Sequence, residues 1–138
     1  MNTLWANDEE LFTLARKELF TAVVGDVMDK LNLRRQFLPP QIQPLERRMM
    51  AIGRALTVLE ADFFEELALG RNSLSGKPFG LMLEALDDLK KNEIYVCTGA
   101  SPSYALWGEL MSLRAQRCGA AGAVHGDRDS PARSLRAD

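Results

Sequence analysis

The chain has 138 residues, of which 46% are hydrophobic and 26% charged, and its formal net charge is −2 at pH 7. This length suits one folded domain, and the balance of residues is that of an ordinary globular protein. A charge so close to zero offers neither the basic surface typical of nucleic-acid binding nor a basic segment for a membrane surface. No apolar run approaches the roughly eighteen residues that a membrane span needs. We therefore expect partners other than nucleic acid and membrane.

The first dozen residues, MNTLWANDEELF, lack the basic and apolar regions of a signal peptide. The two cysteines, Cys97 and Cys118, lie far apart in the sequence, which favours reduced thiols over a disulfide framework. Such cysteines are more often core thiols than nucleophiles. These features predict a cytoplasmic protein.

Hydrophobic periodicity predicts helices that alternate with strands. Asp8 can cap the first helix and Asn32 can end the second, while Gly53 is a possible bulge in the first strand. Asn92 can end the third helix in a left-handed turn, and Gly119 ends the fourth. The helices are expected near residues 8–19, 21–31, 79–90 and 108–118, and the strands near residues 50–59, 93–98 and 122–125. This alternation predicts an α/β layered domain with some parallel pairing.

The chain leaves the predicted strand EIYVCTG through a loop and enters a helix near Gly108. The first amides of that helix, around Glu109, Leu110 and Met111, have no intrahelical acceptors and therefore offer a small anion site. Gly108 would let a ligand approach the backbone closely. Glu109 suits the positive end of the helix dipole, which is the commoner role of such a residue, and it could also face a bound cation or its water.

The last predicted strand ends in the sequence HGDRD. Arg128 could grip a carboxylate with two parallel hydrogen bonds, and a hard cation such as Mg²⁺ would choose Asp127 or Asp129 because it prefers oxygen ligands. An Arg-Asp pair on a turn is more often a solvated ion pair. His125 is equally well explained as a strand-end residue and as a base. Spacing alone therefore leaves catalysis and simple surface chemistry both open.

Five segments, in order along nearly the whole chain, resemble the RraA-like family. This family includes the class II 4-hydroxy-4-methyl-2-oxoglutarate/4-carboxy-4-hydroxy-2-oxoadipate aldolases and the regulator of ribonuclease activity A. The segments are TAVVGDVMDKLNL, FLPPQIQPL, MAIGRALTV, ALDDLKKNEIYVCTG and ALWGELMSLRAQRCGAAGAVHG. The resemblance implies a single RraA-like domain over residues 1–138 with a swivelling β/β/α layered sandwich, shortened at its C-terminus. It also implies a homotrimer with active sites between subunits.

The activity that the resemblance implies is that of a divalent-metal-dependent lyase, a class II pyruvate aldolase. Such an enzyme cleaves a 4-hydroxy-2-oxo diacid to pyruvate and a second 2-oxo acid, and decarboxylation of oxaloacetate is a related expectation. The amides of Gly108–Met111 would hold the pyruvate carboxylate, and Glu109 would orient metal-bound water. Arg128 would bind the 2-oxo acid and its enolate, and Asp129 would hold Mg²⁺ or another divalent cation such as Mn²⁺.

Two features depart from the family pattern. Eighteen residues separate Glu109 from Arg128, two fewer than in the aldolases, and the resulting shift of the turn matters because such chemistry suffers from errors of about 1 Å. Family members also continue well beyond the Arg-Asp pair, so missing strands would leave an open sheet edge and exposed apolar surface. Two other hypotheses therefore remain: a non-catalytic binding protein like the ribonuclease regulator, and an inactive truncated homologue.

Overall fold

A computed structural model describes residues 4–62, 81–99, 105–126 and 133–135. In these ranges the strands form one five-stranded sheet in the order β1-β5-β4-β3-β2. The elements are α1 (Asp8–Glu18), α2 (Thr21–Lys30), β1 (Gln43–Pro44), β2 (Arg54–Leu59), α3 (Leu81–Asp87), β3 (Glu93–Thr98), α4 (Glu109–Cys118), β4 (Gly122–Gly126) and β5 (Arg133–Leu135). None of the helices in this part of the chain is long and apolar enough to cross a membrane.

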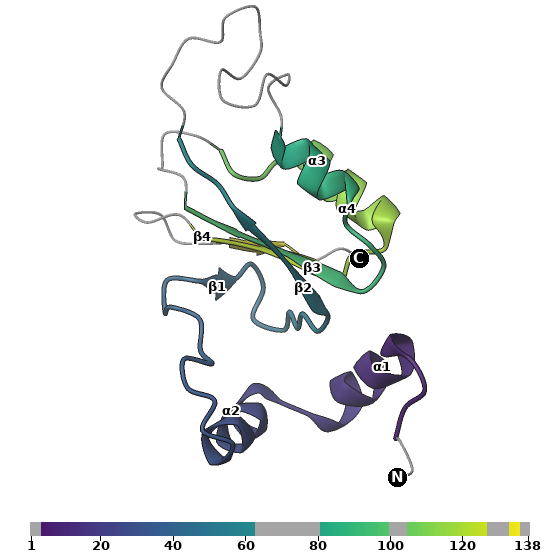
Figure 1. The fold of residues 1–138 in the computed structure, drawn as a ribbon, viewed down its shortest axis with the longest axis vertical. Helices are drawn as coiled ribbons and strands as arrows, with labels where there is room; N and C mark the ends of the chain where they lie inside the picture. The colour runs from purple at the N-terminus through teal and green to yellow at the C-terminus, as the bar shows by residue number, and fades with distance from the viewer. Residues whose placement is uncertain (1–3, 63–80, 100–104, 127–132, 136–138) are drawn as a thin grey trace, which may run out of the picture.

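The centre of the sheet is a run of three parallel strands. β2 pairs with β3, and β3 pairs with β4, with Ile94 opposite Gly122 and Thr98 opposite Gly126. Right-handed crossovers that advance in one direction place their helices on one face of the sheet, and α3 and α4 lie together on one side (Figure 1). The predicted α/β alternation and the parallel neighbours at residues 93–98 and 122–125 are confirmed.

The hydrophobic core lies between this sheet and helices α3 and α4. The central strand β3 contributes Tyr95 and Cys97, which are the most deeply buried side chains in the described residues. α3 and the turn after it contribute Leu86 and Leu89, and α4 contributes Met111 and Ala115 among others. Successive side chains of a strand point to opposite faces, so Tyr95 and Cys97, two residues apart, both point into the layer between the sheet and the helices.

Two short strands, which the sequence did not predict, extend the sheet beyond β4. β5 runs antiparallel to β4, with Val124 opposite Ser134, and β1 pairs parallel with β5. Strands of two or three residues are too short to show an alternating hydrophobic pattern. The chain therefore adds a further strand to the sheet after the Arg-Asp pair.

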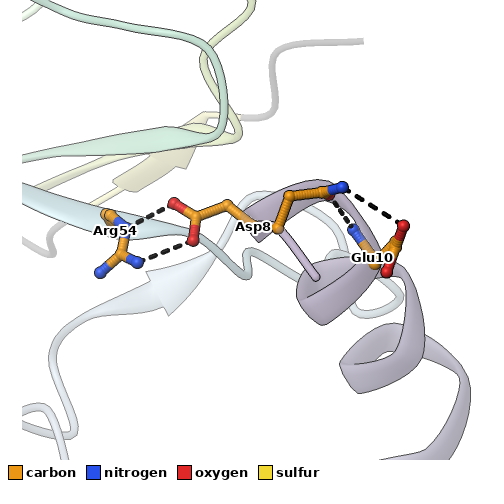
Figure 2. A network of polar contacts seen from close by, with 4 residues as sticks. Asp8, Glu10 and Arg54 are labelled. Atoms are coloured by element: carbon orange, nitrogen blue, oxygen red, sulfur yellow. Dashed lines mark hydrogen bonds and ion pairs between the residues drawn. The ribbon is translucent and has the colours of Figure 1, made fainter. Parts of the chain in front are cut away.

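The start of α1 differs from the expectation that Asp8 is the capping residue. Asn7 is the N-cap, and its side-chain oxygen accepts a hydrogen bond from the amide of Glu10 at 3.0 Å. Asp8 instead accepts hydrogen bonds of 2.5 and 2.7 Å from the guanidinium of Arg54, as Figure 2 shows. The prediction was wrong because the carboxylate of Asp8 joins α1 to the start of β2, a contact between residues distant in sequence.

Three asparagine and glycine positions were expected to end helices. Asn32, two residues after α2, and Gly119, directly after α4, have positive φ angles of 58° and 74°, as expected. Asn92 is also left-handed, with φ 64°, but α3 has already ended at Asp87. Residues 79–80, the expected start of this helix, lie outside the described residues.

Gly53 lies just before β2, which begins at Arg54 rather than near residue 50. It is therefore not a bulge within the strand, and that prediction was wrong. Its backbone instead lies against the carbonyl oxygen of Asn92, so closely that a Cβ atom would collide with it. The glycine is required by this close approach of two chain segments.

The N-terminal helices lie on the other side of the sheet from α3 and α4 (Figure 1), and neither packs extensively against another helix or strand. Polar contacts join α1 to the sheet region. We call residues 19–38 the apolar arm, because α2 and its flanking segments expose many large hydrophobic side chains. They are Leu19, Phe20, Val24, Val27, Leu31, Leu33, Phe37 and Leu38.

Candidate functional site

The candidate site lies where the parallel strands end. β3 ends at Thr98 and β4 ends at Gly126, and these two residues are opposite one another in the register. The chain leaving β3 returns through α4, whose N-terminus therefore belongs to the crossover from β3 to β4. In α/β folds, ligands bind beyond the carboxyl ends of parallel strands. The expected anion site at the N-terminus of α4 thus lies in the β3–β4 crossover, which leaves the sheet at the carboxyl end of β3.

The first turn of α4 is open to a ligand. Gly108 is the N-cap residue, with extended φ and ψ angles of −147° and 175°, and no side chain caps the helix. Among the described residues, and apart from its own chain neighbours and helix backbone, no atom lies within 4 Å of the position that a Cβ on Gly108 would occupy. Glu109 and Leu110 are exposed. The amides of this turn therefore have free space before them, which suits the predicted binding of a carboxylate.

Met111 plays a different part from its neighbours in this turn. Its side chain is buried in the core against residues of β3 and α3. Only its backbone amide is thus suited to face a ligand, whereas the side chain anchors the helix start to the sheet. The first turn of α4 is therefore anchored to the core by the Met111 side chain, while its backbone amides have free space before them.

A hydrogen-bonded pair of side chains braces this turn. The indole Nε1 of Trp107 donates to the hydroxyl of Ser112 at 2.8 Å, and this hydroxyl donates to the carbonyl oxygen of Gly108 at 3.1 Å. The ring of Trp107 packs against that of Tyr95, with ring centroids 5.2 Å apart and planes tilted by 55°. The sequence analysis missed Trp107 and Ser112. They occupy the positions before the N-cap and in the second turn that pack together in hydrophobic staples, and this spacing was the available signal.

The Arg-Asp pair expected to complete the site lies outside the described residues. Asp127, Arg128 and Asp129 follow directly after Gly126, the last residue of β4. His125 is half-buried and lies opposite Cys97 in the register of β3 and β4. The structure therefore brings the end of β4 beside β3, and the roles of Arg128 and Asp129 remain predictions.

A half-buried carboxyl group lies at the end of β2, and the sequence analysis also missed it. The hydroxyl of Tyr95 makes a long hydrogen bond of 3.5 Å to Oε1 of Glu60. Burial raises the pKa of Glu60, and the hydrogen bond from Tyr95 opposes that shift. Burial also raises the pKa of the Tyr95 hydroxyl. No signal in the sequence marked Glu60, because its burial depends on Tyr95 and on the pairing of β2 with β3.

Cys97 is a core thiol and not a nucleophile. Its side chain is buried, and burial together with the nearby charge of Glu60 raises its pKa to about 12. A thiol that stays protonated at neutral pH is a poor nucleophile. Cys118 is half-buried beside the same core, and both cysteines are free. The interpretation of these residues as core thiols agrees with this environment.

Residues 4–62, 81–99, 105–126 and 133–135 contain no group of three or more histidine, cysteine, aspartate or glutamate side chains that could hold a metal ion. The acidic residues at the end of β4 fall outside these ranges.

Comparison with known proteins identifies the family. A family model described as RraA-like, Aldolase/RraA, matches residues 21–131. Neither the curated proteins nor the solved structures gave a significant match. The matched range runs from α2 to beyond β4 and includes both the first turn of α4 and the Arg-Asp pair. The mixed α/β fold agrees with this assignment, and the chain belongs to the RraA-like family.

Proposed function

We propose that the chain is a divalent-metal-dependent lyase. It cleaves a 4-hydroxy-2-oxo diacid, of the 4-hydroxy-4-methyl-2-oxoglutarate type, to pyruvate and a second 2-oxo acid, and it decarboxylates oxaloacetate. The observation that carries the proposal is the open first turn of α4, in the crossover that begins at the carboxyl end of β3 in a chain of the RraA-like (Aldolase/RraA) family. The family alone supports a general aldolase or regulator role.

The first turn of α4 would bind the carboxylate next to the 2-oxo group. Its amides point along the helix axis, and the partial positive charge at the helix start favours an anion. Gly108 leaves room for the carboxylate to reach the backbone. Arg128 would hold the other side of the substrate, because a guanidinium forms paired hydrogen bonds with planar oxygen groups.

The donor set fits a hard divalent cation. Glu109 is an exposed carboxylate on the first turn of α4, and Asp127 and Asp129 follow β4. Carboxylate oxygens are the ligands that Mg²⁺ and Mn²⁺ prefer, whereas soft sulfur ligands are not at hand, since the thiol of Cys97 is buried. When bound, the cation would withdraw electrons from the 2-oxo group and stabilise developing negative charge. Asp129 would hold it.

The reaction breaks the bond between C3 and C4 of the substrate. The 4-hydroxyl loses its proton, its oxygen becomes the carbonyl oxygen of the second product, and the electron pair of the broken bond forms the enolate of pyruvate. A proton returned to C3 then yields pyruvate. In oxaloacetate the same bond breaks with loss of CO₂. Arg128 would stabilise the enolate oxygen, and Glu109 would accept or return a proton through water.

We further propose that the protein is a homo-oligomer, with a trimer as the expected state. The apolar arm supports this assembly. Phe20, Val24, Val27 and Leu31 follow a helical spacing along α2 and are all exposed. A helix with an apolar stripe is stable when that stripe is covered, and a second copy of the chain would cover it. Free thiols at Cys97 and Cys118 suit the expected cytoplasmic location.

One observation favours a second function. The spacing between Glu109 and Arg128 is two residues shorter than in the aldolases. A turn displaced by this change would keep the fold and the assembly but lose the alignment that catalysis needs. The chain would then be a binding protein of the ribonuclease-regulator type.

The experiment is a coupled assay of pyruvate release by the purified protein, with and without Mg²⁺, together with its mass by light scattering. The lyase is expected to release pyruvate from oxaloacetate and from 4-hydroxy-4-methyl-2-oxoglutarate only with the metal. A trimer without any metal-dependent release would contradict the lyase and favour the binding protein. A monomer without release would favour an inactive homologue.

A further inference from the structure

The first turn of α4 is fixed by a link between side chains that flank it. Trp107 precedes the N-cap and Ser112 lies one turn into the helix. In many helices these two positions hold apolar side chains whose contact fixes the angle at which the chain joins the helix. Here a hydrogen bond of 2.8 Å, from the indole Nε1 to the hydroxyl of Ser112, takes the place of that contact.

The hydroxyl of Ser112 also holds the peptide that carries the N-cap. It accepts from Trp107 and donates to the carbonyl oxygen of Gly108 at 3.1 Å, which uses its one proton. The same carbonyl accepts the amide of Ser112 at 3.0 Å. Gly108 has no side chain of its own to cap the helix. The two hydrogen bonds that its carbonyl oxygen accepts from Ser112 therefore restrain a glycine, which is the most flexible kind of residue in a chain.

The indole is itself held in place. Its ring packs on Tyr95, which has no exposed surface and belongs to the central strand β3. The Tyr95 hydroxyl reaches Glu60 at the end of β2. A continuous series of contacts therefore connects the end of the sheet with the carbonyl of Gly108, whose neighbouring amides face the open space before the helix.

We propose that Trp107 and Ser112 are positioning residues that hold the first-turn amides of α4 in the orientation that binds the substrate carboxylate. This inference rests on the proposed lyase function. Neither side chain touches the substrate in this account, since the hydroxyl of Ser112 and the indole nitrogen are engaged with each other. They act by reducing the freedom of the Gly108 peptide, and binding is stronger when the groups that bind are ordered beforehand.

The test compares Ser112→Ala, Trp107→Phe and the double variant with the wild-type protein. Affinity for pyruvate in the presence of Mg²⁺ is measured by calorimetry, and KM and kcat are measured for oxaloacetate. Trp107→Phe removes one neutral hydrogen bond and is expected to bind pyruvate about threefold more weakly, whereas Ser112→Ala also removes the bond to the Gly108 carbonyl and is expected to bind up to about tenfold more weakly. KM is expected to rise by a similar factor while kcat changes little, because the carboxylate is bound in both ground and transition states.

The double variant provides the sharper comparison. Both substitutions break the same hydrogen bond, and so the double variant is expected to match Ser112→Ala rather than to multiply the two losses. Ser112→Thr keeps the hydroxyl and is expected to restore most of the affinity. Thr13→Ala, which removes an exposed hydroxyl from α1, serves as the matched control and is expected to bind pyruvate as the wild type does.

A purely structural role would give a different result. Alanine is a stronger helix former than serine, and Trp107→Phe keeps a ring on Tyr95, so both variants are expected to remain folded. Melting temperatures that fall without any change in pyruvate affinity would overturn the inference and leave the lyase intact. Wild-type protein that neither binds nor releases pyruvate would overturn both this inference and the proposed lyase function. That outcome needs no variant, so the two failures can be told apart.

Discussion

The layer between the sheet of β2, β3 and β4 and helices α3 and α4 buries apolar side chains, whereas the apolar arm exposes most of its large ones. Tyr95 has no exposed surface and Leu86 is 3% exposed, but Phe20 is 60% and Leu31 65% exposed. Contacts within one chain therefore account for the sheet and its two covering helices. They do not account for the sequence of the arm, and an exposed apolar stripe of this kind is typical of a surface that binds a partner.

The largest expected difference between these two regions is in the cost of removing a leucine. Leu86→Ala leaves a cavity in the core and is expected to lower the free energy of unfolding by about 2–5 kcal/mol. Leu31→Ala is expected to cost under about 1 kcal/mol at protein concentrations low enough to dissociate the assembly, and more at high concentration. Urea unfolding at two protein concentrations measures both. Equal costs for both variants at every concentration would contradict this division of the molecule.

Placing a charge on the arm tests its role in assembly. Val27 is 48% exposed on α2, and Val27→Asp would bury an unpaired charge if a second copy covers this face. We expect the subunits to dissociate at least about tenfold more readily, because the charge must be desolvated. Sedimentation velocity over a dilution series measures the change, with the exposed Asp26→Asn on the same helix as the control. An unchanged assembly in Val27→Asp would place the interface elsewhere.

Two glycines separate structural from functional demands on the backbone. Gly53→Ala places a Cβ against the carbonyl oxygen of Asn92 and is expected to lower the free energy of unfolding by about 1–3 kcal/mol. Gly108→Ala meets open space and is expected to cost less than about 1 kcal/mol. Its methyl group would instead stand in front of the first-turn amides and weaken pyruvate binding. Thermal melting measures the effect of each substitution on stability, and pyruvate titration measures its effect on binding. Full pyruvate affinity in Gly108→Ala would exclude this turn as the carboxylate site.

The ion pairs of α1 are expected to give a small dependence of stability on acid. Hydrogen bonds from Arg54 and Lys91 lower the pKa values of Asp8 and Glu9. A lowered pKa means that each carboxylate stabilises the fold above its unfolded value near about 4, and that this stabilisation is lost as the pH falls further. Both pairs are exposed, so the effect is small and screened by salt. Asp8→Asn is expected to differ from the wild type at pH 7 and to converge with it below pH 4.

Glu60 is expected to have the opposite effect on how the free energy of unfolding changes with pH. Its pKa is raised by burial, so the protonated form is favoured in the folded state. The stabilisation that Glu60 contributes is present at low pH. It is lost as the pH rises from the pKa of Glu60 in the unfolded chain, about 4.3, through its raised pKa in the folded protein. Glu60→Gln is therefore expected to gain stability relative to the wild type between pH 4 and pH 7. Urea unfolding at several pH values measures it, and a gain that shrinks with rising pH would contradict the burial of this carboxyl.

The long periodic elements could be predicted from the sequence, whereas contacts across the fold could not. The helices at α1, α2 and α4 and the strands at β3 and β4 were predicted to within about two residues, because each carries a clear apolar period and an end signal such as Asn32 or Gly119. The role of Asp8 was mistaken because its partner, Arg54, lies in another element. β1 and β5 are too short to carry a pattern.

The same limit applies to the candidate site. The open start of α4 followed from Gly108 and the helix pattern alone, since local chemistry determines where amides lack acceptors. Glu60 could not be found, because its burial depends on Tyr95 and on the pairing of β2 with β3. Arg128 and Asp129 were proposed from the resemblance to the family, and the described residues do not test them.

The most direct test of the central claim is kcat/KM for pyruvate release with Mg²⁺, measured on the wild type and on Arg128→Lys together with their melting temperatures. Lysine keeps the charge but cannot make the paired contacts of a guanidinium. If Arg128 grips the 2-oxo acid, its replacement is expected to cost about 2–4 kcal/mol of transition-state stabilisation, or roughly 30- to 1,000-fold in kcat/KM, with little change in melting temperature. A variant with full activity and a lowered melting temperature would make Arg128 structural and contradict the lyase site described above.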